Sequence, residues 1–253
     1  MEGKKKQETG ARVEVKNLTK KFGDLLVLDD ISFNVNKGEF LCIVGPTGCG
    51  KTTFLNSLTK LYDLTAGEIL VNGESVDPKK HNISYIFQEY SAMPWLSVED
   101  NIRFGLDIKG VPKQEAQENV EEMLDIVGLT KFRKQYPHQL SASMLQRVSI
   151  ARAFATKPEL LLMDEPYGQL DIELRFKLED ELIKLWERLG TTVLFITHNI
   201  EEAVYLGQNI MVLTNKPTKV KTVIPDKMPH PRDVTALEFV ELRNHVTDMI
   251  KWW

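Results

Sequence analysis

The residues with the clearest chemical potential form a glycine-rich run, GPTGCGKT, at positions 45–52. Two glycines bracket four residues and are followed by Lys and Thr, which is the pattern of a loop that holds nucleotide phosphates. Glycine lets backbone N–H groups converge on an anion, and a helix that begins near Lys51 would point its positive end at the same anion. The run therefore predicts a phosphate site made by Gly45, Pro46, Thr47, Gly48, Cys49, Gly50, Lys51, Thr52 and Thr53.

Two side chains of this loop have predictable roles. The ammonium of Lys51 would reach the β- and γ-phosphates of a nucleoside triphosphate, and the hydroxyl of Thr52 would bind Mg²⁺. The apolar run FLCIV before the loop and the helical pattern after it supply the context that the motif requires. A plain glycine-rich turn is the simpler alternative. We expect a nucleoside triphosphate and Mg²⁺ as the ligands.

A second candidate site is the acidic pair Asp164 and Glu165, which follows the apolar run LLLM. A buried strand that ends in two carboxylates places both at the carboxyl edge of a sheet, where α/β folds bind ligands. We expect Asp164 to hold Mg²⁺ and Glu165 to act as general base for the water that attacks the γ-phosphate. His198 follows another apolar run, VLFIT, and would contact the γ-phosphate at the same edge. The alternatives are an exposed acidic turn and a structural histidine.

These residues need an α/β framework to position them. Short apolar runs bounded by turn residues are typical of strands buried on both faces, and they occur at 40–44, 160–163, 193–196 and 210–213. Alternating patterns at 12–17 and 31–36 predict half-exposed antiparallel strands. Helical patterns cover 113–127, 171–189 and 236–253, whereas prolines interrupt the pattern after residue 215.

The order of these elements predicts the domain organisation. Residues 95–156 contain helical patterns without a convincing strand, which indicates a helical subdomain inserted into an α/β core. We expect a flexible tail at 1–10 and a single domain at 11–253. Within that domain, 11–94 and 157–235 would form the core, 95–156 the helical subdomain and 236–253 a C-terminal helix.

Composition narrows the functional class. The formal net charge of −4 argues against nucleic acid as a partner, because proteins that bind it carry a concentrated basic surface. The two cysteines, Cys42 and Cys49, have no metal-ligand spacing and favour a reducing compartment. The opening MEGKKKQETG lacks the apolar stretch of a signal peptide, and no run approaches the roughly 18 apolar residues of a membrane span. We expect a soluble chain whose membrane role would come through a partner.

In their order along nearly the whole chain, these motifs resemble those of the ATP-binding subunits of ABC transporters. The resemblance rests on Phe22, GPTGCGKT, Gln88, the segment 140–147, LLLMDEP, Leu170–Asp171 and His198. It implies a P-loop NTPase (RecA-like) α/β core with an N-terminal antiparallel β subdomain and an inserted helical subdomain. The implied activity is ATP hydrolysis coupled to transport, with Glu165, His198, Gln88 and Lys51 as catalytic residues.

The resemblance also implies roles for residues that the motifs alone do not explain. Phe22 would stack on the adenine, with simple packing as the alternative. Gln88 would bind Mg²⁺, sense the attacking water and link catalysis to a permease, which segment 89–102 would contact. Leu170 and Asp171 would lie in a loop through which two ATPase subunits communicate.

The implied partners are an integral-membrane permease, a second ATPase subunit in a homo- or heterodimer and, indirectly, an extracellular substrate-binding protein. This places the chain at the cytoplasmic face of the cell membrane. FQEYSAMPWLSVEDNI, DEPYGQLD and PHPRD are similar to importers of nitrate, sulfonates and taurine. Two alternatives stay open: a soluble ABC-type ATPase that acts on a macromolecule, and a small-molecule phosphotransferase with the same loop.

One segment departs from the family pattern. The family signature reads Leu-Ser-Gly-Gly followed by Gln or Met, whereas this chain has LSASM at 140–144. By resemblance, Ser141 and Ser143 would cap the triphosphate held by the opposite subunit. Ala142 and Ser143 replace the glycines, so three interpretations remain: a working but slower signature, a degenerate half-site in a heterodimer, or a site that binds ATP without efficient turnover.

Overall fold

The structure, a computed structural model, describes residues 10–89, 91–168, 170 and 172–250. Nearly all of the predicted tail at 1–10, Asp171 and the Trp252–Trp253 end of the last predicted helix lie outside these residues. The strands are β1 (Val13–Phe22), β2 (Leu25–Val35), β3 (Phe40–Val44), β4 (Ala66–Val71), β5 (Glu74–Ser75), β6 (Ile83–Ile86), β7 (Leu160–Asp164), β8 (Thr192–Ile196), β9 (Asn209–Leu213) and β10 (Val220–Pro225). The helices are α1 (Lys51–Leu58), α2 (Val98–Ile108), α3 (Lys113–Ile126), α4 (Ala142–Ala155), α5 (Ile172–Leu189), α6 (Ile200–Leu206) and α7 (Leu237–Ile250), with 3-10 turns η1 (Thr130–Phe132) and η2 (Pro137–Gln139).

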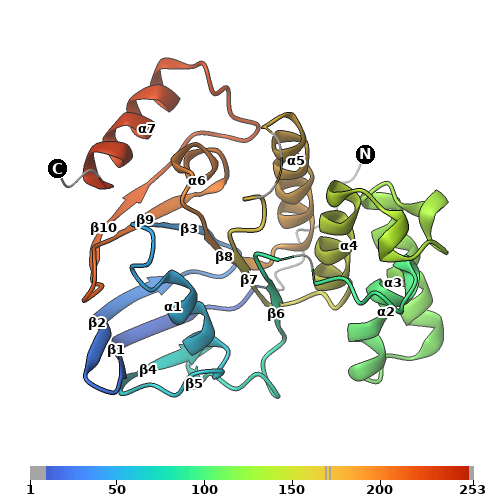
Figure 1. The fold of residues 1–253 in the computed structure, drawn as a ribbon, viewed down its shortest axis with the longest axis horizontal. Helices are drawn as coiled ribbons and strands as arrows, with labels where there is room; N and C mark the ends of the chain where they lie inside the picture. The colour runs from blue at the N-terminus through green and yellow to red at the C-terminus, as the bar shows by residue number, and fades with distance from the viewer. Residues whose placement is uncertain (1–9, 90, 169, 171, 251–253) are drawn as a thin grey trace.

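Two sheets organise the chain (Figure 1). The larger sheet has the strand order β10-β9-β3-β8-β7-β6, and all of its neighbouring strands are parallel except β10, which is antiparallel to β9. The smaller sheet, β2-β1-β4-β5, is antiparallel throughout. The predicted buried strands are confirmed as β3, β7, β8 and β9, and the α/β class of the fold is confirmed with them.

The central strands are buried on both faces, because every residue of β3, β7 and β8 is buried. In β3, Leu41 and Ile43 belong to a core shared with α1 and the smaller sheet, whereas Phe40, Cys42 and Val44 belong to a core shared with α4, α5 and α6. Burying each large apolar side chain contributes about 1.5–3 kcal/mol. A slip of one residue would exchange the two cores, so the register of these strands, and the position of the residues that follow them, is strongly specified.

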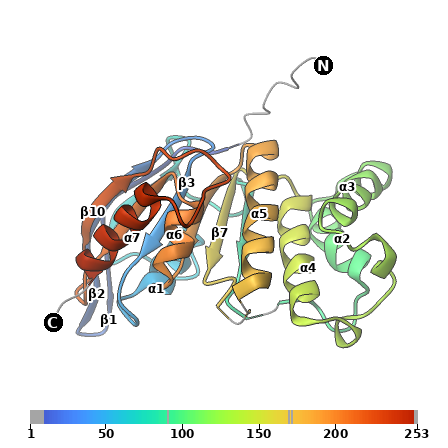
Figure 2. The same ribbon diagram turned by 90° about the horizontal axis from the view of Figure 1, so that it is seen from above.

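Residues 95–156 hold helices α2, α3 and α4 and the two 3-10 turns, and no strand occurs among them. Ser97 caps α2 by accepting a hydrogen bond from the backbone N–H of Asp100 at 3.2 Å. In Figures 1 and 2 these helices form one end of the molecule, with α4 standing beside α5.

The structure differs from the expected elements in two places. The N-terminal strands are longer than 12–17 and 31–36, because shifts of register between β1 and β2 interrupt the alternating pattern without ending the pairing. Strand β10 lies in the segment that we interpreted as interrupted by prolines. Pro225 ends that strand at the edge of the sheet, where a missing N–H is tolerated.

The PHPRD segment ties the C-terminal part of the chain to α6. The buried guanidinium of Arg232 pairs with Asp226 at 2.9 Å and donates hydrogen bonds to the carbonyls of Val204 and Gly207. Carbonyls at a helix end have no partner within the helix, so Arg232 satisfies groups that would otherwise be buried without one. The segment therefore stabilises α6, which begins directly after His198.

Glu179 on α5 makes the free energy of unfolding depend on pH. Its side chain is 1% exposed, and neither carboxylate oxygen has a hydrogen-bond partner among the described residues. Burial, followed by the nearby charge of Glu202, raises its pKa from 4.5 to about 8, against the opposing charge of Arg175. Between those values the unfolded chain releases a proton that the folded chain keeps, so stability falls as the pH rises.

We expect Glu179→Gln to stabilise the protein on the order of a few kcal/mol near pH 8 and very little near pH 4. Urea denaturation at both pH values measures the difference. Glu173→Gln on the same helix is the control, because that carboxylate is 82% exposed and its substitution should change stability by less than about 0.5 kcal/mol at either pH. An equal effect of Glu179→Gln at both pH values would contradict the prediction.

Candidate functional site

The phosphate loop connects β3 to α1, and its shape requires glycine. Gly48 has φ 75° and Gly50 has φ 117°, in the left-handed region that other residues rarely adopt. A Cβ on Gly50 would lie 2.9 Å from Cγ1 of Val27. Gly50 is also the N-cap of α1. The loop therefore ends at the N-terminus of that helix, where the helix dipole is positive.

An open cavity of about 270 Å³ lies on this loop. It is lined by Thr47, Gly48, Gly50, Lys51, Thr52, Thr53, Glu165 and Lys216. The structure therefore brings most of the predicted phosphate-binding residues together with the predicted catalytic carboxylate. A concave site with backbone N–H groups and an ammonium fits the phosphates of a nucleotide.

Gly45, Pro46 and Cys49 are the three predicted residues of the loop that are not among those lining this cavity. Lys51 is buried, and its ammonium donates hydrogen bonds to the carbonyls of Gly45 at 3.0 Å and Pro46 at 3.1 Å. Cys49 is 2% exposed, with burial raising the pKa of its thiol against the opposing charge of Lys51. These three residues shape the loop from behind, and Cys49 is poorly placed for thiol chemistry.

The four predicted catalytic residues meet at one carboxylate, that of Glu165. Its oxygens lie 4.0 Å from the ammonium of Lys51 and 3.0 Å from Nδ1 of His198. The side-chain amide of Gln88 donates a hydrogen bond to it at 3.3 Å. The side chain of Glu165 is 17% exposed, so a group at this point can reach both the cavity and water.

The backbone of Glu165 is strained. Its φ of 45° is unusual for a residue with a side chain, and such conformations cost about 1–3 kcal/mol. Two hydrogen bonds hold it: its N–H donates to the carbonyl of Ile196 at 2.9 Å, and its carbonyl accepts from Gly168 at 3.2 Å. Strain of this kind persists only where the surrounding structure holds the residue in place, and it clusters at functional sites.

Asp164 ends β7 beside the loop and is 5% exposed. Burial raises the pKa of its carboxyl, and the charge of Glu165 acts in the same direction, while hydrogen bonds from Thr52 and Tyr85 lower it. The hydroxyl of Tyr85 donates at 3.3 Å. A buried carboxylate beside a threonine hydroxyl supplies the hard oxygen ligands that Mg²⁺ prefers.

The predicted magnesium ligands Thr52, Gln88 and Asp164 all line a second cavity of about 510 Å³, next to the first. Thr52 lines both cavities and connects the phosphate side to the metal side. The side chains present therefore fit a magnesium ion at this point.

Three predicted ligands of the nucleotide, Phe22, Ser141 and Ser143, are not among the residues that line these two cavities. Phe22 is 43% exposed and packs edge-on against Tyr62, with ring centroids 5.3 Å apart. Ser141 caps α4 by accepting from the N–H of Met144 at 3.4 Å, and its hydroxyl lies 3.1 Å from that of Ser143. Figures 1 and 2 show α5 and β7 between α1, the helix after the phosphate loop, and α4, the helix that Ser141 caps and that contains Ser143.

Two residues at the site were missed from the sequence. Tyr85 lies in β6, the parallel neighbour of β7, so a strand assigned to 83–86 would have placed it at the same edge as Asp164. Lys216 lines the phosphate cavity from the loop between β9 and β10 and belongs to no motif.

Comparisons with known proteins identify the family of the chain. A family model described as ABC transporter matches residues 28–168, more than half of the chain. The chain belongs to the ABC transporter family. An uncharacterized ABC transporter ATP-binding protein of Methanocaldococcus jannaschii is 41% identical over 254 residues, which cover 99% of this ABC chain and 95% of the relative. An aliphatic sulfonates import ATP-binding protein of Bacillus cereus is 39% identical over 237 residues, covering 94% of this chain and 93% of the relative.

A solved structure extends the comparison. An ATP-binding cassette in a dimeric post-hydrolysis state, bound to ADP and Pi, superposes with a TM-score of 0.73 at 32% identity, covering 84% of this ABC chain and 98% of that one. The P-loop NTPase fold is confirmed, and the chain is an ATP-binding subunit of the ABC class, whose members are ATPases. None of the helices formed by the described residues is long and apolar enough to cross a membrane.

We expect Gly50→Ala to weaken ATP binding at least about tenfold and to lower stability by about 1–3 kcal/mol, because a side chain there combines an unfavourable φ with a collision against Val27. Calorimetric titration with ATP and thermal unfolding measure the two effects. Gly73→Ala is the matched control, since Gly73 also has a positive φ of 85° but nothing within 4 Å of its added Cβ. It should lose stability and keep ATP affinity; equal loss of affinity in both variants would refute a local effect on the loop.

Proposed function

We propose that this chain hydrolyses ATP to power a membrane importer of small organic or inorganic anions, working as one of two ATPase subunits on a permease at the cytoplasmic face of the membrane. The observation that carries the catalytic part is the Glu165 carboxylate at the phosphate cavity, contacted by His198 and Gln88 and 4.0 Å from Lys51. The Bacillus cereus relative, named an aliphatic sulfonates import ATP-binding protein, supports the class of transport.

In the proposed reaction, ATP and water give ADP and phosphate. Glu165 accepts a proton from the attacking water. The hydrogen bond from Gln88 to Glu165 holds the side-chain amide beside the carboxylate, where the amide orients the same water. Lys51 and His198 stabilise the negative charge on the γ-phosphate oxygens. Magnesium, held by Thr52, Asp164 and Gln88, would neutralise charge on the phosphate oxygens.

The signature segment supports a dimer. Ser141 begins a helix that lies apart from the loop of its own chain, so its hydroxyl and the N–H groups of α4 reach a triphosphate only on a second subunit. Neither Ala142 nor Ser143 has a positive φ, so the backbone there does not need the freedom of glycine. This favours a working signature, slowed only by two added side chains, over a silent one.

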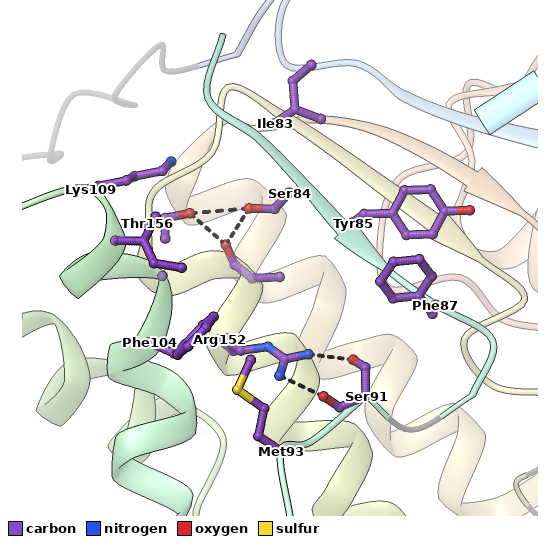
Figure 3. A pocket seen from close by; sticks show the side chains of 13 residues that line it. Ile83, Ser84, Tyr85, Phe87, Ser91, Met93, Phe104, Lys109, Arg152 and Thr156 are labelled. Atoms are coloured by element: carbon purple, nitrogen blue, oxygen red, sulfur yellow. Dashed lines mark hydrogen bonds between the residues drawn. The ribbon is translucent and has the colours of Figure 1, made fainter. Parts of the chain in front are cut away.

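The contact with a permease is proposed for the segment 89–102 and the cavity beside it. That cavity, of about 380 Å³, lies between β6, α2 and α4 and is mainly apolar, with Phe87, Met93 and Phe104 among its lining (Figure 3). Arg152 of α4 donates a hydrogen bond to the carbonyl of Ser91 at 2.8 Å and joins the segment to the helices. Phe87 lines this cavity and directly precedes Gln88. A permease segment that displaced Phe87 would therefore also move the side-chain amide of Gln88.

We expect Glu165→Gln to lower the rate of phosphate release by about 10²- to 10⁴-fold, because the general base is lost, while ATP binding remains. Phosphate release and calorimetric titration with ATP measure the two effects. Glu173→Gln, on an exposed face of α5, is the control and should hydrolyse normally.

Unchanged turnover in Glu165→Gln would remove Glu165 from catalysis. Absence of saturable ATP binding in the unsubstituted protein would refute the proposed function. The tagged Glu165→Gln subunit also tests the transport part, because ATP should hold it in its complex. A multi-span membrane protein should co-purify with it from native membranes, and recovery of soluble partners alone would favour an ATPase that acts on macromolecules.

Restoring both signature glycines with Ala142→Gly and Ser143→Gly should raise ATP turnover, because two side chains leave the surface that approaches the opposite nucleotide. Turnover measured with the permease present decides this. An unchanged rate would mean that crowding at the signature does not limit hydrolysis.

A further inference from the structure

Lys216 is a cation at the phosphate cavity that the catalytic scheme does not use. It lines the cavity together with Lys51 and the glycines of the loop. Its side chain is exposed, and no acidic side chain pairs with it among the described residues. Its neighbour Lys219, in the same turn, instead pairs with Asp29 at 3.0 Å.

The turn that carries Lys216 is held rigidly against the phosphate loop. Thr218 is fully buried, and its hydroxyl donates a hydrogen bond to the carbonyl of Cys49 inside the loop. The backbone N–H of Thr218 donates to Val27 at 2.9 Å, and its carbonyl accepts from Asp29 at 2.9 Å. The position of Lys216 at the rim is therefore set by buried contacts, although its own side chain is in water.

The base of the turn is closed as well. The N–H of Thr214 donates to the carbonyl of Lys219 at 3.0 Å, and the N–H of Lys219 donates to the hydroxyl of Thr214 at 2.9 Å. Lys216 thus extends from a short closed loop that follows β9, the strand beside β3. Because β3 leads into the phosphate loop, the two loops leave the same edge of the sheet side by side.

The charge balance of the cavity points to an anionic ligand for Lys216. Among the described residues that line the cavity, Glu165 is the acidic one, and it already contacts His198 and Gln88. Lys51, which also lies 4.0 Å from Glu165, and Lys216 supply two positive charges against this one carboxylate, and the N-terminus of α1 adds a partial positive charge. A chain of phosphates is the ligand that such a set attracts most strongly.

We infer that Lys216 is a second cation for the phosphate chain of the nucleotide, acting from the outer rim of the cavity while Lys51 acts from within the loop. The inference rests on the proposed nucleotide site and adds a binding residue to it. As an exposed ammonium, Lys216 attracts phosphates as a point charge screened by salt. It therefore strengthens binding of ATP and ADP at low salt and contributes less as the salt concentration rises.

The test compares Lys216→Ala, Lys216→Arg and the control Lys219→Ala by calorimetric titration with ATP and with ADP at 20 and 500 mM salt. We expect Lys216→Ala to weaken both nucleotides about 3- to 10-fold at low salt, with a smaller loss at high salt. Lys216→Arg should bind nearly as the unsubstituted protein, because it keeps the charge. Lys219→Ala should not change affinity, since its partner is Asp29. The ratio of kcat to KM for ATP hydrolysis should fall in Lys216→Ala by the same factor as the affinity.

Equal affinity of Lys216→Ala and the unsubstituted protein at low salt would overturn the inference, as would an equal loss in Lys219→Ala. In both cases saturable binding by the unsubstituted protein would leave the proposed function standing. Failure of the unsubstituted protein to bind ATP would instead defeat the proposed function itself. Because Lys216 is exposed, thermal unfolding of Lys216→Ala should match the unsubstituted protein, which separates a loss of affinity from a loss of structure.

Discussion

Burial of the central strands on both faces is the constraint on which the site depends. Alternate residues of β3 belong to two different cores, one with α1 and the smaller sheet and the other with α4, α5 and α6. Register is therefore fixed from both sides at once. Since β3, β7 and β8 are parallel neighbours, the residues after each strand arrive at one edge, and this is how Lys51, Glu165 and His198 come within hydrogen-bonding or ion-pair distance.

Burial in the core also makes unpaired polar side chains energetically costly. Arg232 and Asp226 balance each other and satisfy the end of α6, whereas Glu179 has no comparable partner among the described residues. Asp164 is buried too, but hydrogen bonds from Thr52 and Tyr85 lie against it. The two carboxyls also differ in position, because Asp164 lines the cavity proposed for magnesium and Glu179 does not line any cavity described above.

How far the sequence predicts the site depends on how local each feature is. Asp164, Glu165 and His198 directly follow apolar runs, and Lys51 belongs to the glycine-rich motif that follows another, so hydrophobic pattern, strand direction and that motif predict all four at one edge. The left-handed backbone of Glu165 could not be predicted, because it is held by contacts with Ile196 on the neighbouring strand.

Two further features depend on segments distant in sequence. Strand β10 was hidden by its flanking prolines, although Pro225 occupies the edge of the sheet. The position of Lys216 depends on Thr218 bonding to the phosphate loop 169 residues away. A motif search identifies residues that lie next to the motif in the sequence. A residue such as Lys216, which another segment brings to the site, can be assigned to it only when the order of strands in the sheet is known.

The separation of Ser141 from the phosphate loop has a consequence for control of hydrolysis. In one chain the side of the cavity proposed for the γ-phosphate is open to water, with the side chain of His198 56% exposed. The missing side of the site would be the N-terminus of a partner's α4, which carries a partial positive charge without a titratable group. In the proposed site, charge stabilisation by Lys51 and Lys216 would already be available in each subunit alone, but exclusion of water and the last N–H donors would come only with closure. If the proposed function holds, the subunit would bind ATP by itself and hydrolyse it only when paired, and a permease that controls pairing would control the reaction.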